Sequence, residues 1–143
     1  MTRRAIAAAL AAAAALLGAC TSQPTSPADC RPTAPTHQGS LLVLVADPPE
    51  SSIRGVLAGS APPAAGQRYE VRWLVDSRKA GGALRVIAQR EGTGQVYREQ
   101  VAASSVSGLI AEFQAGLLFP ANGCWDADIS TGTALGSLTF RVV

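Results

Sequence analysis

Residues 68–75 read RYEVRWLV, the clearest strand pattern in the chain. Every second side chain is apolar, at Tyr69, Val71, Trp73 and Val75, and these alternate with three charged ones, Arg68, Glu70 and Arg72. Successive side chains of a β-strand point to opposite faces of its sheet. The alternation therefore predicts a strand with one buried face and one solvated face.

The same alternation returns downstream of this stretch. Leu84, Val86 and Ala88 are separated by outward positions, and residues 91–94 predict a hairpin loop into a strand at 95–101. Near the C-terminus, two further strands are predicted by apolar residues at every second position, joined by a turn at 130–136; these residues are Trp125, Ala127 and Ile129, then Leu138, Phe140 and Val142.

The segments around these strands are shorter or ambiguous. Residues 41–46 and 52–58 predict two short strands, and residues 59–66 predict a loop. The apolar residues within 104–119 are compatible with a short helix, but Gly108 and Gly116 weaken that pattern, and we expect a loop with short strands there. Seven or eight short strands with regular turns predict an all-β domain at 41–143, an antiparallel β-sandwich.

The first twenty residues have the layout of an export signal. Arg3 and Arg4 precede an apolar run, and Gly18 and Ala19 precede Cys20. The run is too short to span a membrane. A cysteine at this place resembles the lipobox of bacterial lipoproteins. The resemblance implies that residues 1–19 are cleaved, that Cys20 is acylated with diacylglyceryl and palmitate-type chains, and that the protein is anchored to the bacterial cell membrane on its extracytoplasmic side. The alternative is a soluble secreted protein.

Residues 20–40 predict a flexible tether, because prolines alternate there with serine and threonine and no apolar period is present. An extended chain of this kind rises about 3.1 Å per residue, so the nine residues between Cys20 and Cys30 span at most about 30 Å. Such a short tether would hold the domain close to the bilayer.

Two cysteines remain once Cys20 is assigned to the anchor. An oxidising compartment favours a disulfide between Cys30 and Cys124, worth about 4–5 kcal/mol for a loop of roughly 95 residues. Two free thiols or a metal site are the alternatives. In a regular strand, Cys124 shares its face with Asp126 and Asp128, away from the core, so we expect the bridge at the rim or outer face of a sheet; a bulge at Gly123 would reverse this.

The charge balance argues against a nucleic-acid partner. Without residues 1–19, the chain has ten basic and ten acidic residues. Binding to phosphates needs a basic patch, which a neutral surface does not favour. The expected partners are the lipid bilayer, through acylated Cys20, and an unidentified envelope protein or polymer.

No set of residues predicts a reaction, a metal site or a cofactor. His37 is the single histidine and lies in the predicted tether. Asp126 and Asp128 project from one strand and are the candidate ligand-binding pair, for calcium or for acid–base chemistry. A calcium site needs further oxygens, for which the candidates are Asp47, Glu50 and Asp76, and a hydrolase needs another acid that converges with the pair in a pocket. The alternative is a solvated sheet face.

The C-terminal segment has its own resemblance. Residues 119–125, FPANGCW, and residues 138–142, LTFRV, are similar to the ending of small bacterial lipoproteins of uncharacterised function, in which a Pro-x-x-Gly-Cys-Trp segment precedes the last hairpin. The resemblance covers the last half of the chain. It implies an immunoglobulin-like sandwich on a lipid anchor, and it implies no activity.

The expected function is therefore that of a non-enzymatic, lipid-anchored binding module of the cell envelope. Two alternatives stay open. One is a small envelope hydrolase that uses Asp126 and Asp128. The other is a lipid-anchored inhibitor or accessory subunit that contacts a partner through loops 47–52 or 59–66, or through an exposed apolar patch.

Overall fold

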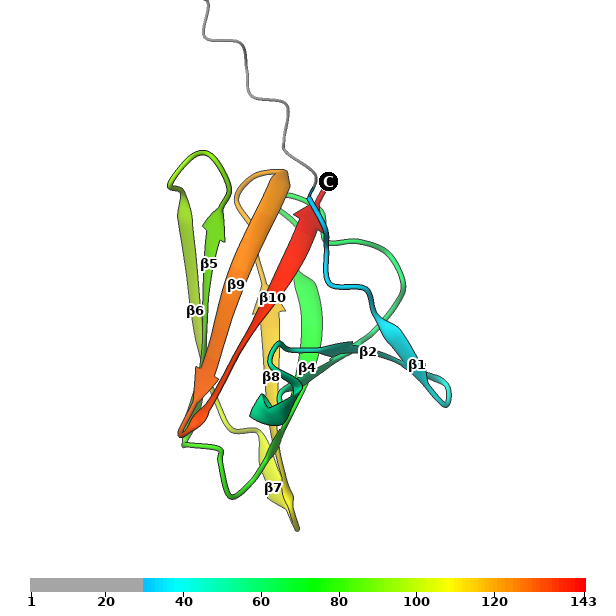
Figure 1. Ribbon diagram of the computed structural model, residues 1–143, viewed down its shortest axis with the longest axis vertical. Coiled ribbons are helices and arrows are strands. Elements are labelled where there is room, and N and C mark those ends of the chain that lie inside the picture. Colours follow the sequence, from blue (N-terminus) through cyan, green and yellow to red (C-terminus); the bar gives the residue numbers. More distant parts are fainter. Residues whose placement is uncertain (1–29) are drawn as a thin grey trace, which may run out of the picture.

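Strand β4 (Tyr69–Asp76) contains most of the stretch RYEVRWLV and lies in the middle of the larger of two sheets. The computed structural model describes residues 30–143, and in it two antiparallel sheets pack face to face (Figure 1). Val71, Trp73 and Val75 are buried between the sheets, as the alternation predicts. The predicted all-β antiparallel sandwich is confirmed.

The larger sheet has the strand order β1-β2-β3-β4-β8-β7. The remaining bounds are β1 (Thr36–Gln38), β2 (Leu41–Val45), β3 (Arg54–Leu57), β7 (Ser105–Ser107) and β8 (Ile110–Leu117), with one 3₁₀ turn, η1 (Pro49–Ser51), between β2 and β3. The smaller sheet has the order β10-β9-β5-β6, with β5 (Ala83–Arg90), β6 (Val96–Ala102), β9 (Gly123–Thr131) and β10 (Ala134–Val142).

This strand order is that of an immunoglobulin-like sandwich. Strands β3-β4-β8-β7 follow the A-B-E-D order of one immunoglobulin sheet, and β10-β9-β5-β6 follow the G-F-C-C′ order of the other. The hairpin β1–β2 extends the first sheet beyond its A strand. The disulfide does not follow the immunoglobulin pattern, because it joins β9 to the segment before β1 and not to a strand of the opposite sheet.

An aromatic cluster fills one end of the core. Phe119 lies at its centre, with ring centroids 5.4 Å from Phe140, 5.5 Å from Trp125 and 5.6 Å from Tyr97. Tilted rings at these separations pack favourably because the positive edge of one ring meets the negative face of another. Trp73 and Trp125 are both fully buried, so the structure uses them as core residues and not as an exposed stacking surface.

The expectation of a loop with short strands at residues 104–119 is wrong for most of that segment. Strand β8 pairs with β4 along its whole length, from Tyr69↔Leu117 to Asp76↔Ile110. Its inward side chains include two alanines, at 111 and 115, whose small size weakens the apolar pattern. Gly116 lies at an outward position of β8, and the aliphatic part of Arg68 covers it, so a Cβ there would lie 2.8 Å from the Arg68 Cγ and Cδ atoms.

Residues 30–40, assigned to the flexible tether from their composition, pack on the sandwich. The Thr33 N–H donates to the Thr139 carbonyl oxygen at 2.8 Å, and β1 pairs with β2 through Thr36↔Val43 to Gln38↔Leu41. With β1 and the two strands of 104–119, ten strands form within residues 30–143, where seven or eight were expected. We call residues 30–35 the strap.

Candidate functional site

The disulfide between Cys30 and Cys124 fastens the strap to the smaller sheet. Their Cα atoms lie 5.5 Å apart, and the predicted pairing is confirmed. Asp126 and Asp128, on the same face of β9 as Cys124, are solvent-exposed, and neither cysteine belongs to the core cluster. The alternation of β9 therefore placed the bridge correctly, outside the core.

Polar contacts hold the rest of the strap along β10, the edge strand of this sheet. The Arg141 Nη2 atom donates to the Cys30 carbonyl oxygen at 2.9 Å. The Thr139 N–H donates to the Thr33 Oγ1 atom at 2.9 Å, and the Thr33 N–H donates back to the Thr139 carbonyl oxygen. The strap thus runs beside an edge whose backbone groups would otherwise be unpaired.

A groove of about 350 Å³ lies between the strap and the loop that follows β3. Its floor is formed by Leu44, Leu57, Tyr69 and Phe140, and its walls are residues 32–35 of the strap and residues 60–63 of the loop. Leu44 on β2 and Phe140 on β10 belong to the core cluster, so the groove reaches the hydrophobic core. We call it the strap groove.

The far wall of the strap groove is held by the C-terminus. The Val143 N–H donates to the Pro63 carbonyl oxygen at 3.0 Å, and the Ala65 N–H donates to the Val143 carbonyl oxygen at 2.8 Å. Figure 1 shows the start of the described chain beside the C-terminus, at the same end of the sandwich. Backbone hydrogen bonds therefore hold both walls: the strap is bonded to β10, and the loop is bonded to Val143.

The residues that line the strap groove include one charged residue, Arg141. No carboxylate among residues 30–143 forms an ion pair with it. Tyr69 is half-buried in the floor, with its ring in an edge-on contact with Phe140 at 6.3 Å between centroids. Burial raises the pKa of the Tyr69 phenol above its ordinary value of 10.0, so the group is neutral at physiological pH.

Asp126 and Asp128 project from β9 on the exposed face of the smaller sheet. Asp126 accepts a hydrogen bond from the Thr139 hydroxyl at 2.7 Å. The strand partners of Asp128 are Ser137 on β10 and Ile87 on β5, neither of which is acidic. The two aspartates therefore lie on an open surface with neutral neighbours.

The further acids considered for a site with these aspartates are not gathered around them. Asp47 pairs with Ser137, which places it two strand spacings, about 10 Å, from Asp128. Asp76 is bound by Arg78 at the end of β4, and Glu50 lies in η1. No group of three metal-ligating side chains occurs within residues 30–143. His37 is exposed on β1.

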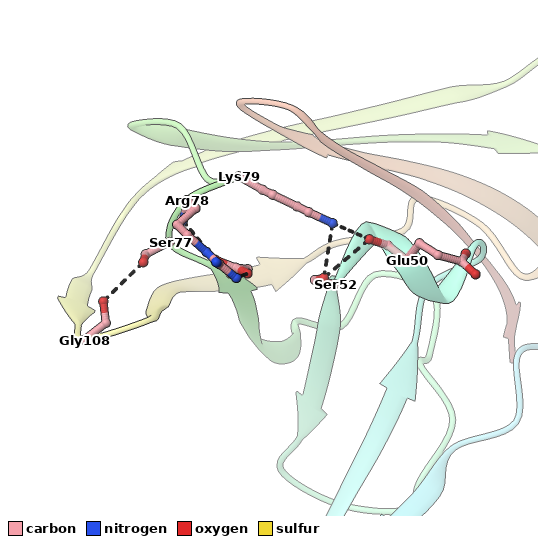
Figure 2. A network of polar contacts seen from close by, with 7 residues as sticks. Glu50, Ser52, Ser77, Arg78, Lys79 and Gly108 are labelled. Atoms are coloured by element: carbon pink, nitrogen blue, oxygen red, sulfur yellow. Dashed lines mark hydrogen bonds and ion pairs between the residues drawn. The ribbon is translucent and has the colours of Figure 1, made fainter.

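Polar contacts join three loops at the opposite end of the sandwich (Figure 2). Lys79 reaches from the β4–β5 loop to the Glu50 carbonyl oxygen and the Ser52 hydroxyl. The Ser77 hydroxyl donates to the Gly108 carbonyl oxygen at 3.1 Å and so fixes the β7–β8 hairpin. This hairpin exposes three large apolar side chains, Val106, Leu109 and Ile110. We call these three the hairpin patch.

The strap groove is the feature that sequence reasoning missed. Its walls are two proline-containing segments that composition marks only as a tether and a loop, about 30 residues apart. The predicted disulfide is the one available clue, because it places the strap beside β9.

Cys20 lies outside the described residues, and the described part of the chain holds no helix with the length and apolar character needed to cross a membrane. The comparisons add no relative: the chain matches no protein-family model, no curated protein and no solved structure.

Proposed function

We propose that this chain is a lipid-anchored bacterial envelope protein that acts as a binding module and has no catalytic activity of its own. The observation that carries the proposal is the disulfide of Cys30, because it fixes the chain ten residues after Cys20 to one end of a rigid sandwich. An acylated Cys20 would then keep that end within about 30 Å of the bilayer. The strap groove would face the membrane, and the hairpin patch would face away from it.

The anchor is tested by intact-mass analysis and detergent-phase partitioning of the protein purified from its native host. We expect a mass equal to residues 20–143 plus acyl groups, and recovery in the detergent phase. Cys20→Ser should move the protein to the aqueous phase, whereas Cys30→Ser, the matched cysteine control, should not. An unmodified thiol at Cys20, or a start site elsewhere, would contradict the proposal.

The hydrolase alternative is tested separately. Paired carboxylates act as acid and base when both face one bound substrate, and Asp126 and Asp128 instead line an open sheet face with neutral strand partners. We expect the purified protein to show no hydrolysis of envelope polymers or peptides, and we expect Asp126→Asn and Asp128→Asn to leave that result unchanged. Hydrolysis of envelope polymers or peptides that either variant abolishes would replace the binding-module proposal with the enzymatic one.

A second candidate function is that of an accessory subunit or inhibitor. The observation that favours it is the hairpin patch, in which Val106 and Leu109 are each 65% exposed at the end of the molecule opposite the strap. Apolar side chains gathered on a fixed hairpin are typical of protein–protein contact sites. Cross-linking in native membranes tests it. A cross-linker placed at Val106 or Leu109 should join the protein to a partner, whereas one placed at Glu91, on the hairpin at the other end, should not.

A further inference from the structure

We propose that the strap groove binds the acyl chain of a long-chain fatty acid from the membrane, with the carboxylate of the ligand beside Arg141. This inference deepens the proposed function, on which it rests for the source of the ligand, and it names the ligand class that the binding module takes up.

The floor of the strap groove favours a hydrocarbon chain. Leu44 and Phe140 are 3% and 4% exposed and continue into the core, and Leu57 and Tyr69 complete an apolar surface beside them. A flexible chain that leaves water for such a surface gains free energy with each buried methylene. The volume, about 350 Å³, lies at the lower end of the range of small-molecule sites, so we infer one chain and not two.

The walls of the strap groove disfavour a peptide. An extended peptide is usually bound through backbone hydrogen bonds to a strand edge. Here the walls contain Pro32, Pro35, Pro62 and Pro63, which have no N–H group to donate. The backbone of Thr33 is already engaged with Thr139. The walls therefore offer carbon surface and few donors.

The charge of the strap groove selects the head group. Arg141 is the one charged residue in the described lining, and its Nη2 atom donates a hydrogen bond to the carbonyl oxygen of Cys30, two residues before the lining begins at Pro32. A guanidinium binds a carboxylate through several N–H groups at once, and an ammonium head would be repelled. The hydroxyls of Thr33 and Ser60 lie in the same lining.

Position completes the argument. The strap begins at Cys30, ten residues after the predicted anchor, so the strap groove would lie within about 30 Å of the leaflet. A single-chain lipid that leaves this leaflet would then have only this short distance to cover.

The test uses the mature chain with Cys20→Ser, which keeps every described residue and carries no acyl group. Calorimetric titration compares dodecanoate with dodecylammonium, two soluble probes with one chain and opposite heads, below their micelle concentrations. We expect saturable binding of one dodecanoate and at least about three-fold weaker binding of dodecylammonium, the size of an exposed ion-pair effect. Arg141→Gln should abolish this preference, and Arg141→Lys should retain most of it.

Filling the strap groove provides the second arm. Ala61→Trp and Ala34→Trp place an indole in opposite walls, and each should weaken dodecanoate binding by about ten-fold or more. Ala58→Trp, in the same loop but outside the lining, is the matched control and should change it less than two-fold. Thermal unfolding of each variant shows whether it is folded. If one of the two filling variants does not fold, the other still tests the strap groove.

Three results would overturn the proposal. They are no saturable dodecanoate binding, equal binding of both probes with no effect of Arg141→Gln, and equal weakening by Ala58→Trp. Binding by the Cys20→Ser chain without uptake by the lipidated protein would also overturn it, since the strap groove would then hold the protein's own acyl chain. The first three results are obtained with the Cys20→Ser chain and do not depend on whether Cys20 is acylated in the host, so a failed anchor and a failed groove are distinguishable.

Discussion

Gly132, in the β9–β10 turn, shows how one residue joins two loops. Its φ is +53°, and a Cβ there would collide with the Lys79 carbonyl oxygen and lie 2.7 Å from the Gly81 nitrogen. The close approach lets the Thr133 N–H donate to the Lys79 carbonyl oxygen at 2.8 Å. The β4–β5 loop that carries Lys79 is thus fixed against the opposite hairpin.

We therefore expect Gly132→Ala to lower the free energy of unfolding by about 2–3 kcal/mol, from the positive φ and the collision together. Gly39→Ala is the control, because Gly39 has φ +63° with nothing within 4 Å of the added Cβ. It should cost about 1 kcal/mol, from the backbone conformation alone. Urea unfolding measures both variants, and equal losses would show that the contact with Lys79 is not tight.

Asp76 is the residue whose titration is most clearly shifted. The hydrogen bonds from the Arg78 side chain, 2.7 and 3.1 Å long, lower the pKa of the Asp76 carboxyl from 3.8 to about 2, and the Arg78 N–H adds to this. Because the pKa of Asp76 is lowered in the folded state, its ionised carboxylate stabilises that state, and this contribution is complete above the unfolded pKa of 3.8. That contribution is lost as the pH falls through about 2.

The pKa of Asp76 is measured by NMR titration of its carboxyl carbon. We expect a midpoint near 2 in the parent chain and a midpoint raised toward 3.8 in Arg78→Gln. The same variant should make stability less dependent on pH between about 4 and 2. A midpoint that stays near 2 without the Arg78 guanidinium would assign the shift to another cause.

Among the strands, β8 is the one that pattern reading underestimates, and its contribution to the core is measurable. Phe113 is fully buried and pairs with Trp73 on β4, whereas Gln114 is exposed on the other face. We expect Phe113→Ala to lower the free energy of unfolding by about 3–5 kcal/mol. Gln114→Ala should change it by less than about 0.5 kcal/mol. A small effect at Phe113 would mean that this segment is the loop that composition favours.

The disulfide acts on the molecule as a whole, because it closes 94 residues of sequence separation. We expect the double variant Cys30→Ser, Cys124→Ser to lose about 4 kcal/mol of stability on the chain-entropy account. We further expect faster amide exchange at Thr33, the strap residue whose N–H is bonded to the Thr139 carbonyl oxygen. Hydrogen exchange and urea unfolding measure the two effects. Unchanged exchange at Thr33 would show that β1 alone keeps the strap in place.

Much of this molecule follows from the sequence alone. Alternation determines β4, β5, β9 and β10, because burial of one strand face leaves a direct trace in residue type. Counting cysteines identifies the Cys30–Cys124 pair, and the alternation of side chains along β9 places this bridge outside the core. Only the tertiary structure decided that β8 is a central strand and that the strap covers the sandwich edge. Alanine and glycine in β8 carry little pattern, and strap and loop meet through contacts between distant segments. The strap groove exists only in that meeting, so no local stretch of sequence predicts it.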